Sequence, residues 1–366
     1  MNAIFASPGI GAYVLELVLD LRYSSGSWIY RFVQVLPPFL INLTRLEYRH
    51  LPALNPLFYA LSSRFNTISE LILFGLKKQS FKEILQLTNR CHSLRTVTLI
   101  DCDWKSPSTF YARRGCSFHR FHLEPFRGCY NPQDQRDDVL RWLITSKAAS
   151  TLVAFHLVIS NLPDRIPRLP DLLGLCSATL QALTLDISAS FLDVESSGPL
   201  SPSPSIPSFL ALRDLRISYN NEDLPSFFRF LRQLISKSNS LRNIAIRLHR
   251  ENHFNVDFVP HWKAIDDTLA SSRFSNLQSV EIFENFPRGA KEWQSRSGRK
   301  YISGRLVLLG KLLPGLHKRG VLWWGDITGE GTDIVMQGIP PDEGSTLRDV
   351  WSPLTRQSVF NWRRRP

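Results

Sequence analysis

The chain has 366 residues, of which 43% are hydrophobic and 21% charged, values typical of a folded protein and not of a disordered one. Its net charge of +12 favours contact with acidic partners but does not by itself indicate nucleic-acid binding. The chain contains no run of eighteen apolar residues, and Glu16 interrupts an N-terminal stretch without basic residues. We therefore expect neither a membrane span nor a secretory signal.

A short apolar pattern recurs along the chain. In SLRTVTLIDC, Leu94, Val97, Leu99 and Cys102 fit L-x-x-L-x-L-x-x-N/C, the template of a leucine-rich repeat, in which apolar residues set one face of a short parallel strand. The template can be laid down ten times, with successive starts 24 to 36 residues apart. The units start at Val14, Leu43, Ile68, Leu94, Phe118, Leu152, Leu180, Leu212, Leu241 and Leu277.

Segments with helical periodicity lie between the predicted strands. Residues 80–91 open with Ser80 and Glu83 at capping-box spacing, and residues 223–238 open with Asp223 as the expected N-cap. Residues 28–36, 132–147 and 256–272 also place apolar side chains on one helical face. Alternating strands and helices predict an α/β fold of the leucine-rich-repeat-like solenoid type, with a curved parallel sheet and helices on its convex side.

Three stretches break the repeat pattern. Residues 103–117 resemble a loop, and residues 196–208 are rich in Pro and Ser. After Trp324 no steady period remains. We therefore predict a solenoid over residues 1–326, with a flexible insertion at about 189–208, and a disordered C-terminal tail over residues 327–366.

The residues between the template positions are the candidates for binding. Because side chains alternate across a strand, these residues point to the face opposite the core, which repeat solenoids generally use to bind partners. The alternative is a sheet face that only contacts solvent. We predict a protein partner on this concave face, with these contacts: Glu47, Ile72, Thr96, Thr98, Arg120, His122, His156, Thr184, Arg216 and Glu281.

Metal and catalytic sites are not indicated. The spacing of Cys102, Cys116, His119, His122 and Cys129 matches no standard zinc site with close paired ligands, so we expect no metal and no cofactor. G-x-S-x-G, P-loop and H-E-x-x-H motifs are missing, so we predict no enzymatic activity. Five cysteines, an odd number without disulfide-scaffold spacing, favour a reduced intracellular location, cytoplasmic or nuclear.

Basic residues are concentrated in residues 287–319, which contain nine Lys and Arg residues and one Glu. One interpretation is a nucleic-acid-binding surface, for which the candidates are Arg296, Arg299, Lys300 and Arg305. The other is a solvated region that caps the end of the solenoid. We prefer the second, because no motif for RNA or DNA binding accompanies the charge.

Residues 12–324 resemble the leucine-rich-repeat-like region of fungal F-box proteins. The likeness rests on the opening AYVLELVL, on units such as SLRTVTLIDC, and on LLPGLHKRGVLWW, which looks like the final strand-forming segment of that family. The resemblance implies a non-catalytic protein-protein interaction scaffold that acts as substrate receptor in cullin-type ubiquitin ligation. Because the first repeat starts near residue 14, we expect the ligase adaptor as a partner only if an F-box lies upstream.

Overall fold

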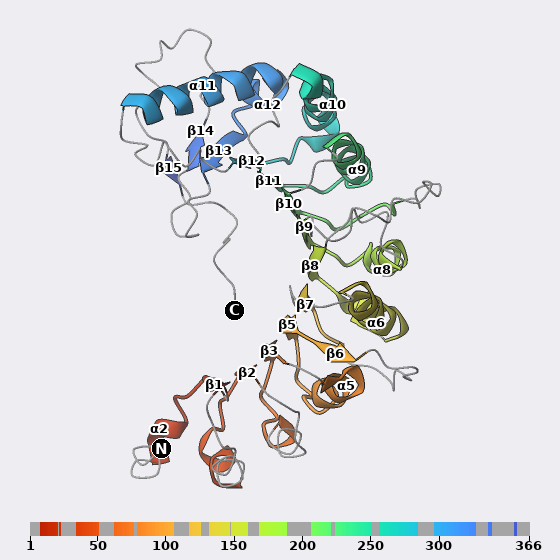
Figure 1. Ribbon diagram of the computed structural model, residues 1–366, viewed down its shortest axis with the longest axis vertical. Coiled ribbons are helices and arrows are strands. Elements are labelled where there is room, and N and C mark those ends of the chain that lie inside the picture. The colour runs from red at the N-terminus through yellow and green to blue at the C-terminus, as the bar shows by residue number, and fades with distance from the viewer. Residues whose placement is uncertain are drawn as a thin grey trace. The chain divides into compact units, whose positions relative to one another are not determined.

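The protein folds as two compact units, Met1–Val158 with Pro167–Cys176, and Ile159–Ile166 with Ser177–Arg365. The computed structural model describes residues 8–20, 22, 34–50, 62–76, 79–105, 117–125, 132–146, 148–159, 168–188, 206–220, 224–249, 256–284, 296–326, 336–338 and 355–356. Figure 1 labels most of their helices and strands.

Strands of the first unit form one parallel sheet in chain order. They are β1 (Glu16–Asp20), β2 (Arg45–Arg49), β3 (Glu70–Phe74), β5 (Thr96–Cys102), β7 (Arg120–Pro125) and β8 (Ala154–Ile159). Each strand begins two residues after the first apolar residue of a predicted unit, which confirms the strand predicted there. The short strands β4 (Gln79–Ser80) and β6 (Trp104–Lys105) pair separately. The prediction of a loop over 103–117 is therefore wrong for Trp104 and Lys105, because the buried Trp104 ring packs 5.1 Å from that of Phe81.

The helices of the first unit precede, separate or follow these strands in the sequence. They are α2 (Pro8–Gly11), η1 (Pro37–Phe39), α5 (Phe81–Thr88), α6 (Pro132–Thr145), α7 (Ala148–Thr151) and α8 (Leu169–Cys176). In Figure 1, α5, α6 and α8 lie on the same side of the sheet. The predicted capping box opens α5: Glu83 accepts a 2.8 Å hydrogen bond from the Ser80 backbone N–H, and Ser80 Oγ accepts one from the N–H of Lys82.

The second unit repeats this arrangement. Its parallel strands are β9 (Ala182–Ser188), β10 (Asp214–Asn220), β11 (Asn243–Leu248), β12 (Ser279–Glu284) and β13 (Leu322–Asp326). Its helices are α9 (Leu224–Ser236), η5 (Val256–Phe258), α10 (Val259–Leu269), η6 (Ser272–Phe274), α11 (Arg296–Leu312) and α12 (Pro314–Lys318). Two short strands follow: β14 (Met336–Gly338) pairs antiparallel with β13, and β15 (Thr355–Arg356) pairs antiparallel with β14.

Equivalent residues of successive repeats lie side by side. In the first unit Leu17, Leu46 and Leu71 are register partners, and the template residues of β2, β3 and β5 are buried. In the second unit Phe228 of α9 meets Trp262 of α10 at a ring-centroid distance of 5.0 Å. The core of each unit therefore lies between its helices and the template face of its sheet, as expected for an α/β fold with parallel strands.

Several strands end in the same way. His50, Gly75 and Asp101 each stand seven residues after the start of their repeat, and all three adopt left-handed backbone angles. A side chain at Gly75 would also meet the His50 ring, with only 2.6 Å between its Cβ and Nδ1. At position 75 glycine adopts this backbone angle without strain, and its lack of a side chain leaves room for the His50 ring.

The predicted insertion and tail fall mostly outside the described residues. Residues 189–205 are outside, whereas β14 and β15 belong to the segment 327–366 that was expected to be disordered. Among the helices that the structure describes, none is long and apolar enough to cross a bilayer.

Candidate functional site

The side chains that alternate with the buried template residues form the sheet surface opposite the helices, here called the helix-free face of each unit. In the first unit it contains one register column, Val18, Glu47, Ile72, Thr98, His122 and His156, and a second, Glu16, Arg45, Glu70, Thr96 and Arg120. In the second unit Thr184, Arg216, Ala245 and Glu281 share one column. The structure thus brings together the predicted contact residues within each unit.

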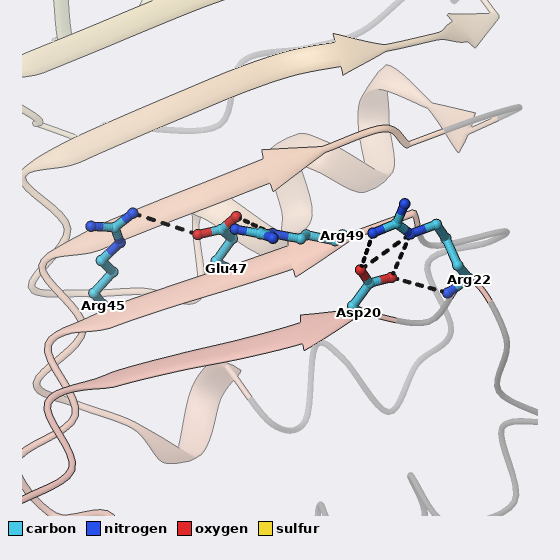
Figure 2. A network of polar contacts seen from close by, with 5 residues as sticks. All are labelled: Asp20, Arg22, Arg45, Glu47 and Arg49. Atoms are coloured by element: carbon cyan, nitrogen blue, oxygen red, sulfur yellow. Dashed lines mark hydrogen bonds and ion pairs between the residues drawn. The ribbon is translucent and has the colours of Figure 1, made fainter. Parts of the chain in front are cut away.

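A charged network occupies the helix-free face at β1 and β2 (Figure 2). Glu47 is buried between two arginines of its own strand: Arg49 donates a hydrogen bond to one carboxylate oxygen, and Arg45 lies 3.5 Å from the other. At the end of β1, Asp20 pairs with Arg22 at 2.8 Å, and this hydrogen bond lowers the pKa of Asp20. The network neutralises the buried carboxylate and fixes the positions of the arginines.

Part of this face is not accessible. Of the ten predicted contact residues, Glu47, Ile72, Thr98 and Glu281 are buried, so the prediction that a partner contacts them is wrong for these four. Each stands in the middle of its strand and is surrounded by side chains of the same strand and of both neighbouring strands. Accessible positions lie beside them, for example the exposed Arg120 of β7.

Two histidines stack on the helix-free face of the first unit. The rings of His122 and His156 lie 3.9 Å apart and are nearly parallel, at 15°. Burial lowers the pKa of His122 to about 4, so its ring is neutral at pH 7. Ligand lone pairs lie in the ring planes, so rings stacked in this way do not direct two nitrogens at one metal ion.

The second unit holds an arginine and a glutamate on either side of an alanine. Arg216 and Glu281 flank Ala245, whose small side chain leaves room for the two charges to interact. Burial lowers the pKa of Arg216 to about 10, while Glu281 and Asp214 raise it, so the side chain stays cationic at pH 7. Nearby, Ser218 and His249 share a 2.9 Å hydrogen bond.

A chain of hydrogen bonds crosses three strands of the second unit at one register position. Asn243 Nδ2 donates to Asp214 Oδ1 at 2.8 Å, and Ser279 Oγ donates to Asn243 Oδ1 at 3.1 Å. These three residues are not among the candidates predicted from the sequence. The signal available was the succession of short polar residues at the same template position.

A second set of polar residues was missed altogether. The residue just before the first apolar template position donates a side-chain hydrogen bond to a backbone carbonyl of the preceding repeat. These bonds, here called the inter-repeat ladder, run from Asn42 to Ala12, Thr67 to Leu43, Ser93 to Asn66, Thr151 to Phe118 and Ser240 to Leu210, at 2.6 to 3.1 Å. Eight of the ten predicted units carry Asn, Ser or Thr at this position, a periodic signal visible in the sequence.

The basic candidates lie on α11. Arg296, Arg299 and Lys300 are in its first turns, and the structure does not describe their side chains. Arg305 forms an ion pair with the buried Glu284 at 3.6 Å, and Glu284 also accepts a 2.8 Å hydrogen bond from Trp324 Nε1. Arg305 therefore neutralises an internal carboxylate, which opposes its use as a phosphate contact.

Comparison with known proteins adds no family. No protein-family model and no curated protein sequence matches the chain. Among the described residues, no group of three or more His, Cys, Asp or Glu side chains is placed to hold a metal ion. What the geometry does offer is an extended polar face in each unit, and the functional inference rests on that face.

Proposed function

We propose that the chain is a non-catalytic protein-interaction scaffold of the leucine-rich-repeat type, which binds a partner protein on its helix-free face. The observation that carries this proposal is the in-register alignment of polar residues along parallel strands, with Thr96 beside Arg120 and Thr184 beside Arg216. Such columns offer an extended surface at regular intervals, which suits another protein better than a small molecule.

Ion pairs and hydrogen bonds between side chains of the helix-free face support the same proposal. Arg45, Glu47 and Arg49 hold one another in place, as do Asp214, Asn243 and Ser279. Side chains that are already ordered lose little conformational entropy when a partner binds. We therefore expect the partner to be recognised mainly by accessible residues of the helix-free face outside these networks, such as Arg120.

The resemblance to fungal F-box proteins suggests a more specific role. In that role the repeats hold the substrate of a cullin-type ubiquitin ligase, and an F-box would be needed to dock on the ligase adaptor. Three buried cysteine thiols, those of Cys91, Cys102 and Cys176, fit the reduced cytoplasm or nucleus in which such ligases act.

Affinity purification with matched charge reversals tests the proposal. Arg120→Glu changes the helix-free face, whereas the control Lys82→Glu changes an exposed position on α5 in the same unit. The proposal predicts a partner that is recovered with the wild type and the control but lost with Arg120→Glu. With purified partner, the dissociation constant should rise about tenfold or more.

Two results separate the parts of the proposal. Equal recovery of every partner by both variants would contradict binding through the helix-free face. Recovery of the ligase adaptor is scored separately, because its absence speaks only against the ligase role.

A further inference from the structure

The first repeat differs from the others at its outer end. Tyr13, Leu15 and Val18 are 85%, 53% and 45% exposed. The next three repeats carry polar residues where the first has Tyr13 and Leu15: Asn42, Thr67 and Ser93 in one position, and Thr44, Ser69 and Arg95 in the other. Apolar side chains thus replace polar ones in the first described repeat, and exposed apolar side chains that lie close together are typical of interaction sites.

Within the described part of the chain, β1 is also the outermost strand of the sheet. Among the described strands, β1 pairs only with β2, so one side of its backbone has no strand partner there. Leu17 is only half-buried, although its register partners Leu46 and Leu71 are fully buried. Natural proteins usually cover or charge such edges, because an open edge accepts a further strand.

Charges specify what kind of strand would fit. Acidic and basic residues alternate at one register position across β1, β2 and β3, as Glu16, Arg45 and Glu70. Glu16 is 62% exposed, and its ion pair with Arg45 is long, at 3.8 Å. A basic residue on an added strand would continue the alternation beside Glu16, and an apolar residue would cover Val18.

We propose that the outer edge of β1 binds an extended segment of a partner protein as an added strand. This segment carries an apolar residue opposite Val18 and Lys or Arg two positions away on each side, facing Glu16 and Asp20. Main-chain hydrogen bonds hold the segment to the edge, and the alternating side chains give specificity. The side chains of this site belong to the helix-free face at β1, but the strand addition uses the backbone edge of β1 and does not depend on the Arg120 contact proposed above.

Peptide binding to the full chain tests this site. The probes are fluorescent peptides of sequence Thr-Lys-Thr-Val-Thr-Lys-Thr and Thr-Glu-Thr-Val-Thr-Glu-Thr, measured by fluorescence anisotropy. The wild type should bind the basic peptide at least about tenfold more tightly than the acidic one. Glu16→Lys should weaken the basic peptide and strengthen the acidic one, while Asp171→Lys, an exposed change on α8, should alter neither.

Hydrogen exchange locates the bound peptide. The basic peptide should slow amide exchange within Glu16–Asp20. Equal binding of both peptides, indifference to Glu16→Lys, or unchanged exchange in β1 would each overturn the proposal. A dimer of the chain that Glu16→Lys dissociates would also overturn it, because the edge would then be occupied by a second copy.

Discussion

Replacing Asp266 by alanine removes the carboxylate that holds the start of α12 against α10. Both oxygens of the buried Asp266 accept hydrogen bonds from backbone N–H groups, from Gly315 at 2.8 Å and from Leu316 at 2.9 Å. These N–H groups belong to the first turn of α12 and have no partner within that short helix. Asp266 thus joins two elements that are about fifty residues apart in sequence.

The expected loss follows from these two bonds. A buried N–H group left without an acceptor costs about 1–3 kcal/mol, so two give roughly 2–6 kcal/mol. Part of this loss of stability is offset, because burying the charged carboxylate of Asp266 is itself unfavourable. Burial raises the pKa of Asp266 more than the two N–H groups lower it, and the alanine variant no longer buries this charge. We therefore expect the free energy of unfolding to fall by about 2 kcal/mol.

Urea unfolding followed by tryptophan fluorescence measures this loss, since Trp262, Trp323 and Trp324 lie in the second unit. The control is Asp267→Ala, which removes the exposed neighbouring carboxylate of the same helix and should change stability by less than about 0.5 kcal/mol. Amide exchange at Leu316 should accelerate in the Asp266 variant only. Equal stability of the two variants would refute the assigned role of Asp266.

Three further predictions concern the first unit and the cysteines. Thr151→Val keeps the side-chain shape but removes the bond to the Phe118 carbonyl, so thermal or urea unfolding should show a loss of about 1 kcal/mol; an unchanged stability would contradict the inter-repeat ladder. As pH falls from 6.5 towards 4, the unfolded chain takes up a proton at His122 that the folded chain does not, so the wild type loses stability, by up to about 3 kcal/mol. His122→Gln should show a shallower pH dependence of urea unfolding, and parallel profiles would contradict this. Burial raises the thiol pKa of Cys102 and Cys176 to about 12, so a maleimide should label them only after denaturation, as mapped by peptide mass spectrometry; labelling of native Cys102 would count against its burial.

The strands were predictable because the pattern that defines them is local. Leu94, Val97 and Leu99 mark the core face of β5 within six residues, and the same spacing marks the other nine strands of the repeat units. The start of α5 was equally predictable, since Ser80 and Glu83 are neighbours in sequence. Within this range of a few residues, periodicity and capping chemistry determine the structure.

The candidate site was less predictable, because its properties depend on side chains from several strands. Alternation correctly placed Glu47 on the helix-free face but could not show that Arg45 and Arg49 fold over it. The pairing of Arg305 with Glu284 depends on how α11 packs on β12, which no local pattern encodes. In contrast, the inter-repeat ladder has a sequence period and could have been found by aligning the residue before each template start.

The inter-repeat ladder also bears on how the chain tolerates change in length. Each hydrogen bond of the inter-repeat ladder connects a repeat to the one immediately before it, so each repeat is coupled directly only to its neighbours. The repeat that starts at Leu212 has Ala211 just before its first template residue, where the ladder donor stands in other repeats, and alanine has no side-chain donor. This side-chain hydrogen bond is therefore missing between the repeats that start at Leu180 and Leu212, and the Pro- and Ser-rich residues 196–208 lie between the same two repeats in the sequence. Strands β9 and β10 on either side of this interval nevertheless pair over seven residues, so a long connection here leaves the strand pairing intact.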